Sequence, residues 1–368
     1  MLSNLGDDDK LRAQRAASQS RSWARWATQW AVQRTLGPTP VSSNAEPLPR
    51  RGIHRVLVCR VSHTLGNTLL ITPLIQEIEQ VFPGCEIDIV TRSQAGAAIF
   101  GQFDRVRRVF EIPNHGISSP HRIASVIRAL RTQTYDLAID PGLLSTTDRL
   151  YVRLANAKWK IGYATKSTDG LTHAIDAPIE VRHVGKVPVY LLREAMKDAQ
   201  RGNYPSLGIA LTFAERAWGR AMLDEVAGRD GPVVALFTAA TGDKHVGAAW
   251  WHCFATRYAD AMPEARIVEI VPLSGQSVLD RRWPTYYTTD LRRLASVLSV
   301  ASRFVSADCG VMHLACASNV PTAGLFRGTD ITEWGPYGMR DLAFDVTSMP
   351  PDEVASVLAA IDERSMIP

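Results

Sequence analysis

The sequence has no uninterrupted apolar run near the ~18 residues that a membrane-spanning helix needs, so an integral membrane protein is not expected. Close to the N-terminus, Asp7, Asp8 and Asp9 stand where a signal peptide would need an apolar stretch, so secretion by that route is not expected. Of the 368 residues, 46% are hydrophobic and 21% are charged, which excludes a disordered or low-complexity chain and predicts about two or three domains.

Cysteine is scarce, and its spacing forms no recognisable pattern. The five cysteines are an odd number and include no CxxC pair. Cys59 and Cys85 lie in apolar, strand-like runs, so they are interpreted as small buried hydrophobic residues in a reducing cytoplasm. No Cys/His cluster has the spacing of metal ligands, and no metal site is expected.

Excess positive charge is absent from most of the chain. Residues 1–51 contain eight Lys and Arg against four Asp and Glu, whereas the rest contains 33 of each sign. The whole formal excess of +4 therefore lies in the N-terminal extension. A neutral body does not indicate a nucleic-acid-binding surface, and no nucleic-acid partner is expected.

This extension has the pattern of one basic helix followed by a linker. Within residues 10–36, Trp23, Trp26 and Trp30 share one face, and Arg21 and Arg25 project from the opposite face. A tryptophan stripe beside arginines is typical of a helix lying in the interface of an anionic membrane. A helix packed on the body, or on a second subunit, explains the stripe equally well. A Pro- and Ser-containing linker ends the extension near residue 51.

From residue 54 onward, apolar strand patterns alternate with helical ones, which predicts parallel sheets with helical crossovers. In the first half, strands are predicted at 54–61, 86–92, 106–112 and 135–140, with helices at 68–82, 94–103, 120–132 and 184–204. In the second half, strands are predicted at 232–237, 265–271, 303–308 and 321–326, with helices at 250–262, 289–301, 311–318 and 351–363.

A breaker cluster at Gly202–Pro205 marks the predicted domain boundary. The predicted units are the extension at 1–51, an N-terminal domain at 52–204 and a C-terminal domain at 205–345. The last segment, 346–368, carries an amphipathic helix that could pack back on the N-terminal domain. Two similar α/β halves predict a ligand between domains, at the carboxyl ends of the strands.

Three turns that follow predicted strands carry side chains suited to chemistry. In the run Asp308–His313, a strand ends, a glycine follows and a helix begins, an arrangement that suits a phosphate; an ordinary helix cap is the alternative. The turn TAATGDK (238–244) offers a hydroxyl, a bare backbone and a point charge, but it lacks P-loop spacing; a solvated loop is the alternative.

The third turn, SHTLGN (62–67), follows the first strand and is expected to face the same cleft. His63 could act as a general base near neutral pH. Asn67 can form hydrogen bonds but cannot take a proton. A plain strand-to-helix connection, with Asn67 as the cap, is the alternative.

Taken together, these turns resemble the family 9 glycosyltransferases, the lipopolysaccharide heptosyltransferases. The likeness spans roughly residues 54–345. Its strongest segments are residues 55–90, YDLAIDPG at 135–142, RLANAKWKIGY at 153–163, and residues 305–338, which resemble the family's donor-site signature.

The resemblance implies a GT-B fold, in which two Rossmann-like domains face each other across a cleft. It also implies inverting transfer of a heptose from a nucleotide diphosphate donor, with ADP-heptose favoured, to a hydroxyl of a saccharide or glycolipid acceptor. No cofactor or metal is implied. The protein would be cytoplasmic and would associate peripherally with the inner membrane through its N-terminal helix.

The resemblance also assigns site residues. The implied donor-binding residues are Thr241, Gly242, Lys244, Asp308, Cys309, Gly310 and His313. The implied acceptor-binding residues are Arg60, Ser62, Thr64 and Gly66. The predicted catalytic residues are Asn67, at the family's catalytic position, and His63, which lies in the same turn.

Two positions depart from the family's pattern. Cys309 stands where Ser or Thr is usual, and Asn67 stands where the family carries an Asp that is the proposed general base. Loss of a general base typically slows a reaction by about 10²- to 10⁴-fold, so His63 is hypothesised to take that role. The alternative function is a non-catalytic or weakly active sugar-nucleotide-binding scaffold. A dinucleotide-dependent oxidoreductase is disfavoured because GxGxxG is missing after the first strand.

Overall fold

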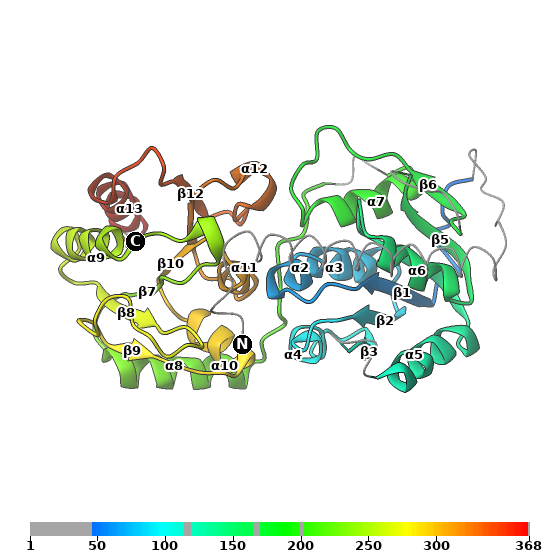
Figure 1. The fold of residues 1–368 in the computed structure, drawn as a ribbon, viewed down its shortest axis with the longest axis horizontal. Helices are drawn as coiled ribbons and strands as arrows, with labels where there is room; N and C mark the ends of the chain where they lie inside the picture. Colours follow the sequence, from blue (N-terminus) through cyan, green and yellow to red (C-terminus); the bar gives the residue numbers. More distant parts are fainter. Residues whose placement is uncertain (1–45, 114–118, 165–169, 199–201, 367–368) are drawn as a thin grey trace, which may run out of the picture.

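The computed structural model describes residues 46–113, 119–164, 170–198 and 202–366. They form two domains, each built on a six-stranded parallel sheet with helices on both faces (Figure 1). The strand orders are β3-β2-β1-β4-β5-β6 and β12-β11-β10-β7-β8-β9. The predicted fold class, two Rossmann-like domains of a GT-B fold, is therefore confirmed. The predicted N-terminal helix at 10–36 lies outside the described residues.

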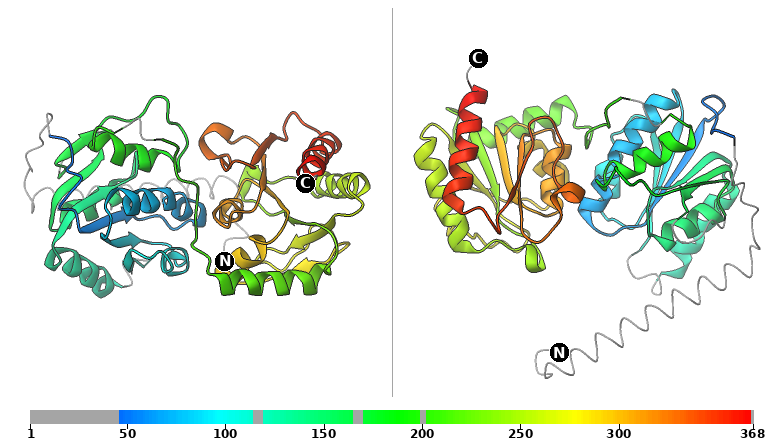
Figure 2. Two further views of the ribbon diagram at one scale, coloured as in Figure 1. Left: turned by 180° about the vertical axis from the view of Figure 1, so that it is seen from behind. Right: turned by 90° about the horizontal axis from the view of Figure 1, so that it is seen from above.

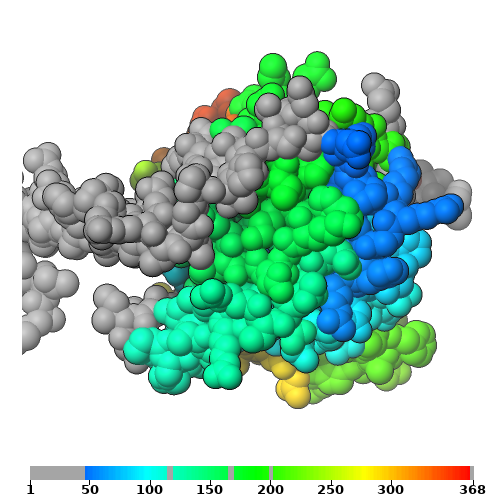
Figure 3. Space-filling view, turned by 90° about the vertical axis from the view of Figure 1, so that its right-hand side faces the viewer, coloured from blue at the N-terminus to red at the C-terminus, as the bar shows by residue number. Residues whose placement is uncertain are grey.

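The N-terminal domain contains the first sheet and its helices. Its strands are β1 (Arg55–Arg60), β2 (Glu86–Thr91), β3 (Val106–Glu111), β4 (Tyr135–Asp140), β5 (Ala157–Tyr163) and β6 (His173–Ile175). Its helices are α2 (Leu65–Leu69), α3 (Thr72–Val81), α4 (Gly96–Phe100), α5 (Pro120–Thr132), α6 (Thr146–Leu154) and α7 (Val187–Ala195). The start of the described chain runs beside α7, where the Leu48 amide donates to the Ala195 carbonyl at 2.8 Å (Figure 3).

The C-terminal domain contains the second sheet. Its strands are β7 (Val233–Phe237), β8 (Arg266–Ile270), β9 (Thr285–Tyr286), β10 (Arg303–Ala307), β11 (Thr322–Phe326) and β12 (Leu342–Asp345). Its helices are α8 (Phe213–Ala227), the 3₁₀ turn η2 (Gly242–Lys244), α9 (Ala248–Ala261), α10 (Leu291–Leu298), α11 (Gly310–Ala317), α12 (Ile331–Trp334) and α13 (Pro351–Met366).

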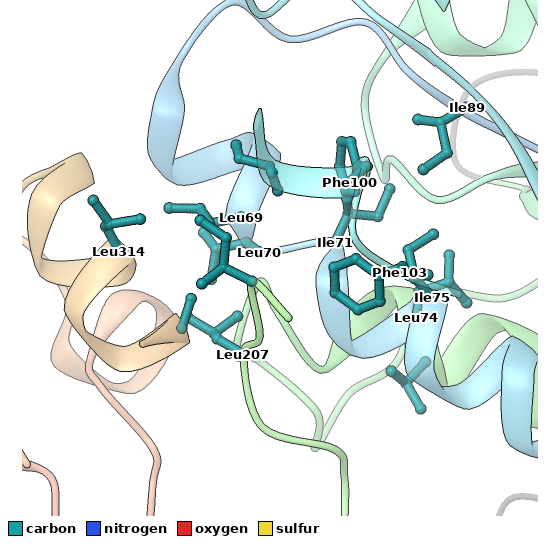
Figure 4. Close-up of a cluster of buried hydrophobic side chains, with 14 of the residues drawn as sticks. Leu69, Leu70, Ile71, Leu74, Ile75, Ile89, Phe100, Phe103, Leu207 and Leu314 are labelled. Atoms are coloured by element: carbon teal, nitrogen blue, oxygen red, sulfur yellow. The ribbon is translucent and has the colours of Figure 1, made fainter. Parts of the chain in front are cut away.

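The central strands are buried on both faces because helices cover both sides of each sheet. Every residue of β7, β10 and β11 is buried. One hydrophobic cluster continues across the domain boundary: Leu314 of α11 lies beside Leu69 and Leu70, with Leu207 of the interdomain segment close by (Figure 4). This apolar contact places α11 against α2. It therefore brings the run Asp308–His313, where α11 begins, close to the turn at 62–67, which leads into α2.

The helix predicted at 68–82 is in fact two helices, α2 and α3, and Pro73 explains the break. Proline has no amide hydrogen, so it cannot continue the helical hydrogen bonds in this turn. The Thr72 hydroxyl donates to the Leu69 carbonyl instead, at 2.7 Å. The helix predicted at 184–204 is also shorter, because α7 ends at Ala195 and Lys197 takes the left-handed φ of 53°.

The C-terminal helix α13 packs on its own domain, which corrects the suggestion that it returns to the N-terminal domain. Its apolar face lies on α9, on the side of the C-terminal domain away from the N-terminal domain (Figure 2). The deciding residue is Asp362, which is buried and accepts hydrogen bonds from Tyr258 at 2.8 Å and from Arg303. A buried carboxylate needs such partners, and only the C-terminal domain supplies them. None of the described helices is long and apolar enough to span a bilayer.

Candidate active site

The candidate site lies where the carboxyl ends of both sheets face the domain boundary. In each sheet the strand order reverses next to the first strand, between β1 and β4 and between β7 and β10. Open α/β sheets bind ligands outside the carboxyl ends of their strands at such a point. The end of β1 and the turn after it carry the predicted acceptor residues, and the turns after β7 and β10 carry the predicted donor residues.

Lys244 and Asp308 bring the two donor turns together. The Lys244 Nζ lies 2.7 Å from Oδ2 of Asp308, which is only 3% exposed. The lysine side chain is 38% exposed, so its charge is held by the protein on one side and available to a ligand on the other. Gly242 permits this turn because it adopts the left-handed φ of 63°. Thr241 and Gly242 themselves are exposed.

His313, in the first turn of α11, is buried at 3% exposure. Burial lowers the pKa of its imidazole to about 4, although the neighbouring Asp308 carboxylate acts in the opposite direction. The imidazole is therefore neutral at physiological pH. A neutral ring can donate one hydrogen bond but adds no charge, so Lys244 is the cationic group of this cluster.

Cys309 caps α11 only through its backbone, since its side chain forms no cap hydrogen bond. Its Sγ lies 3.4 Å from the Ser306 hydroxyl. Burial raises the pKa of the thiol above its ordinary value, so the group stays protonated and is not a nucleophile.

Gly310 and Gly66 bring the predicted donor and acceptor turns close together. A Cβ placed on Gly310 would lie 3.1 Å from the Leu65 Cβ and 3.2 Å from the Gly66 amide nitrogen. A Cβ placed on Gly66 would lie 3.0 Å from Cδ2 of His313. A side chain at either position would therefore force its neighbours to shift by a few tenths of an ångström. The structure thus brings the predicted donor helix directly against the predicted acceptor turn.

The predicted catalytic residues occupy different environments in the β1–α2 turn. His63 and Thr64 are exposed, and Ser62 Oγ lies 3.3 Å from Thr64 Oγ1. Asn67 is half-buried, and its Oδ1 is buried without a hydrogen-bond partner among the described residues. A buried amide oxygen without a donor is costly. Asn67 therefore has hydrogen-bonding capacity that the described protein does not use.

Asp148 is a functional candidate that the sequence did not reveal. It is buried in α6, where its Oδ1 accepts from the Val61 amide at 2.7 Å and its Oδ2 lies 3.5 Å from Arg60 Nη1. It thereby holds both the predicted acceptor residue Arg60 and Val61, the residue just before the turn that carries His63 and Asn67. The signal was hidden because Asp148 is 87 residues from Val61 in the sequence.

Asp140 ends β4 in the same region. Burial raises the pKa of its carboxyl to about 7, against the opposing effect of Arg149, whose Nε donates to Oδ2 at 2.7 Å. The side chain is fully buried and also accepts from the Gly142 amide at 3.2 Å. Its pKa suits a general base, but its burial keeps it away from an acceptor sugar.

A second group that the sequence did not reveal comes from the segment before α7. His183 is 7% exposed, and its Nε2 lies 2.7 Å from the Gly335 carbonyl oxygen of the other domain. Next to Gly335, the Trp334 ring faces Lys244, whose Nζ is 5.9 Å from the ring centroid.

Among the described residues, no cluster of three or more His, Cys, Asp or Glu could hold a metal ion.

Comparisons with known proteins agree with this geometry. Residues 287–355 match the family described as "Glycosyltransferase family 9 (heptosyltransferase)". Lipopolysaccharide heptosyltransferase 3 of Escherichia coli K12 is 26% identical over 315 residues, covering 76% of this chain and 84% of that protein.

Two solved structures share the fold. Escherichia coli heptosyltransferase WaaC with ADP superposes with a TM-score of 0.64 and 20% identity, covering 85% of this chain and 98% of that one. A family 9 glycosyltransferase from Veillonella parvula gives a TM-score of 0.72 and 14% identity, covering 87% of this chain and 100% of that one.

The two six-stranded parallel sheets therefore form a GT-B fold, which these two solved structures share. The family match over residues 287–355 and the 26% identical curated relative make the chain similar to the family 9 heptosyltransferases.

Proposed function

We propose that the chain transfers a heptose from ADP-heptose to a hydroxyl of a saccharide acceptor on lipid-linked lipopolysaccharide core, with inversion. The observation that carries the proposal is the Lys244–Asp308 pair at the start of α11, packed against the β1–α2 turn. A solved relative is described with ADP, and a curated relative is named for lipopolysaccharide. These descriptions supply the proposed donor and acceptor.

In this mechanism Lys244 binds the diphosphate. When the bond from the sugar to the diphosphate breaks, negative charge builds on the departing phosphate oxygen. A fixed ammonium group stabilises that charge more than it stabilises the ground state, which is how electrostatic preorganisation accelerates a reaction. Asp308 limits the motion of Lys244 before the donor arrives. The backbone of Thr241 and Gly242, and the start of α11 at Cys309 and Gly310, complete the proposed donor pocket.

The acceptor hydroxyl is proposed to lie over the β1–α2 turn. Inversion requires the hydroxyl to attack from the face opposite the leaving diphosphate and to lose its proton. Asn67 can orient the hydroxyl but cannot accept that proton, so the exposed His63 is proposed as the general base. Arg60, Ser62, Thr64 and Gly66 are proposed to surround the acceptor.

The reaction is proposed to need no metal or other cofactor, because Lys244 and backbone amides supply the positive charge. Turnover that survives EDTA would support this proposal, and turnover restored by a divalent cation would refute it.

The chain is also proposed to work in the cytoplasm at the inner membrane face. Deleting residues 1–50 should release the protein from anionic liposomes, and unchanged binding would contradict the membrane role.

The central test measures thermal unfolding of the chain with a panel of nucleotide sugars, followed by ADP release in the presence of lipopolysaccharide core saccharides. A ligand at 100 times its dissociation constant stabilises by about 2.7 kcal/mol, which raises the midpoint by several degrees. We expect that shift with ADP-heptose and its loss in Lys244→Met. A shift with a different nucleotide sugar would replace the proposed donor.

One observation favours a second function, a sugar-nucleotide-binding scaffold: the family's usual base position holds Asn67. Under this alternative the nucleotide sugar binds and shifts the midpoint, yet no ADP is released with any core saccharide. ADP release that depends on His63 would exclude the scaffold.

A further inference from the structure

A clasp between the domains lies beside the candidate donor site. We define it as residues 182–185 of the N-terminal domain and residues 330–335 of the C-terminal domain, which includes α12. The Val184 amide donates to the Glu333 carbonyl at 3.0 Å, and the Arg182 guanidinium contacts Asp330 at 2.5 Å. These segments are about 150 residues apart in the chain, so each contact depends on how the domains sit.

The buried contact of the clasp is the one formed by His183. Arg182 is 48% exposed in its side chain and Asp330 is 41% exposed, so water screens that ion pair and limits its contribution. His183, in contrast, is 7% exposed and forms a 2.7 Å bond with the Gly335 carbonyl. Loss of that bond would leave a buried carbonyl without a donor.

The imidazole has a fixed tautomer. The Gly185 amide donates to His183 Nδ1 at 3.0 Å, so Nδ1 carries no proton and Nε2 must carry it. Nε2 therefore donates to the Gly335 carbonyl. The ring also meets Tyr337 edge-on, with centroids 4.6 Å apart, and the Tyr337 hydroxyl donates to the Pro205 carbonyl at 2.9 Å. The orientation of His183 is thus set by three independent contacts.

His183 is linked to Lys244 through two neighbouring residues. It binds the Gly335 carbonyl, and the residue before Gly335 is Trp334, whose ring contacts Lys244. Gly335 is the C-cap of α12, and Trp334 is the last residue of that helix. The Trp334 ring lies over Lys244, and the attraction of an ammonium group to an indole face helps to fix the lysine. A shift of Gly335 would move Trp334, and Trp334 would move Lys244.

We propose that His183 is a positioning residue for the donor diphosphate, acting across the domain boundary through Gly335 and Trp334 on Lys244. The N-terminal domain thereby sets the geometry of the donor site in the C-terminal domain. This inference rests on the proposed role of Lys244 in binding the diphosphate.

Two substitutions of His183 distinguish its hydrogen bond to Gly335, which crosses between the domains, from its hydrogen bond with Gly185, which is local. His183→Gln keeps an N–H donor at the distance of Nε2 and loses the acceptor for Gly185. His183→Asn keeps polar atoms near the position of Nδ1 but is too short to reach Gly335. The probe is ADP, and its dissociation constant is measured by titration calorimetry.

We expect His183→Asn to bind ADP about tenfold more weakly than the wild type, and His183→Gln to remain within about twofold. In a Lys244→Met background, His183→Asn should cause no further loss, because residues that act through one another are not additive. Trp334→Leu, at a half-buried position, tests the next link and should also weaken ADP binding several-fold; it decides the question if His183→Asn does not fold.

Several results would overturn the proposal. Equal affinities for wild type and His183→Asn would refute the positioning role, and so would an equal loss in His183→Asn and His183→Gln. An undiminished effect of His183→Asn in the Lys244→Met background would show that His183 does not act through the lysine. If Lys244→Met alone leaves ADP binding unchanged, the proposed donor site itself is wrong, which is a distinct outcome.

Discussion

Replacing Lys244 should damage folding stability and donor binding together, and the two effects should be separable. In Lys244→Met the Asp308 carboxylate, only 3% exposed, would lose the ammonium group that lies 2.7 Å away. Removing one partner of a fully buried ion pair typically costs about 3–5 kcal/mol. Because the Lys244 side chain is 38% exposed, solvent already screens this pair, and we expect a smaller cost of about 2 kcal/mol.

The expected change in midpoint follows from the size of the domains. About 1 kcal/mol moves the thermal midpoint by ~2–4 °C for domains of this size, so Lys244→Met should unfold about 4–8 °C lower. Asp308→Asn should cost less than ~1 kcal/mol, because it leaves a lysine that can turn to water. The double variant, which has neither charge, should recover most of the lost stability.

Donor affinity should not recover in the double variant. A hydrogen bond to a charged group contributes about 1.5–3 kcal/mol, so ADP should bind ~10- to 100-fold more weakly whenever Lys244 is absent. Circular dichroism at pH 7.5 gives the midpoints and calorimetry gives the dissociation constants. Lys158→Met, at an exposed position in the other domain, is the matched control.

The reasoning fails if Lys244→Met unfolds at the wild-type temperature, since Asp308 would then not depend on the lysine. It also fails if the double variant stays as unstable as Lys244→Met, or if the double variant regains ADP affinity.

Three further predictions follow from other contacts. His63→Gln should lower turnover by about 10²-fold or more and change the pH profile of kcat; full turnover with an unchanged profile would exclude His63 as the base. Gly219→Ala should destabilise the chain by more than ~2 kcal/mol in urea unfolding, because a Cβ there would lie 2.1 Å from the Ser296 carbonyl oxygen; wild-type stability would show that α8 and α10 can separate at no cost. Burial lowers the pKa of His183 to about 4, below the ~6.5 of an unfolded histidine, so the unfolded state binds more protons between these values and stability must fall as pH drops through that window. From pH 7.5 to 4.5 the wild type should lose about 2.5 kcal/mol more than His183→Gln, and parallel losses would contradict the assignment.

The strands and long helices were predictable because their signals are local. The strand at 135–140 and the helix at 120–132 have the predicted bounds, since the apolar run stops before Pro141 and the amphipathic period begins at Pro120. The places of the two turns proposed to bind the donor were also predictable, because Lys244 and Asp308 each lie in the turn after a strand. Their ion pair was not, because it depends on β7 and β10 being neighbours in the sheet.

The remaining features depend on contacts between distant segments, which a pattern of local periodicity does not contain. His183 lies in an irregular segment, and its partner Gly335 is 152 residues away. The amphipathic pattern of α13 does not identify the domain on which this helix packs, and the partners of Asp362 both lie in the C-terminal domain. Asp148 lies in the first turn of α6. Its contact with Val61 was not predictable because the two residues are 87 positions apart in the sequence.

The docking of α13 on its own domain means that the described chain crosses between the domains once, through residues 204–212. Each half is then contiguous in the gene, from the first strand of its sheet to its last helix. A single cut in that segment would yield two fragments, each carrying one complete sheet. The chain is therefore suited to expression in two pieces, and exchange of one half between relatives would test whether the proposed donor and acceptor preferences divide between the halves.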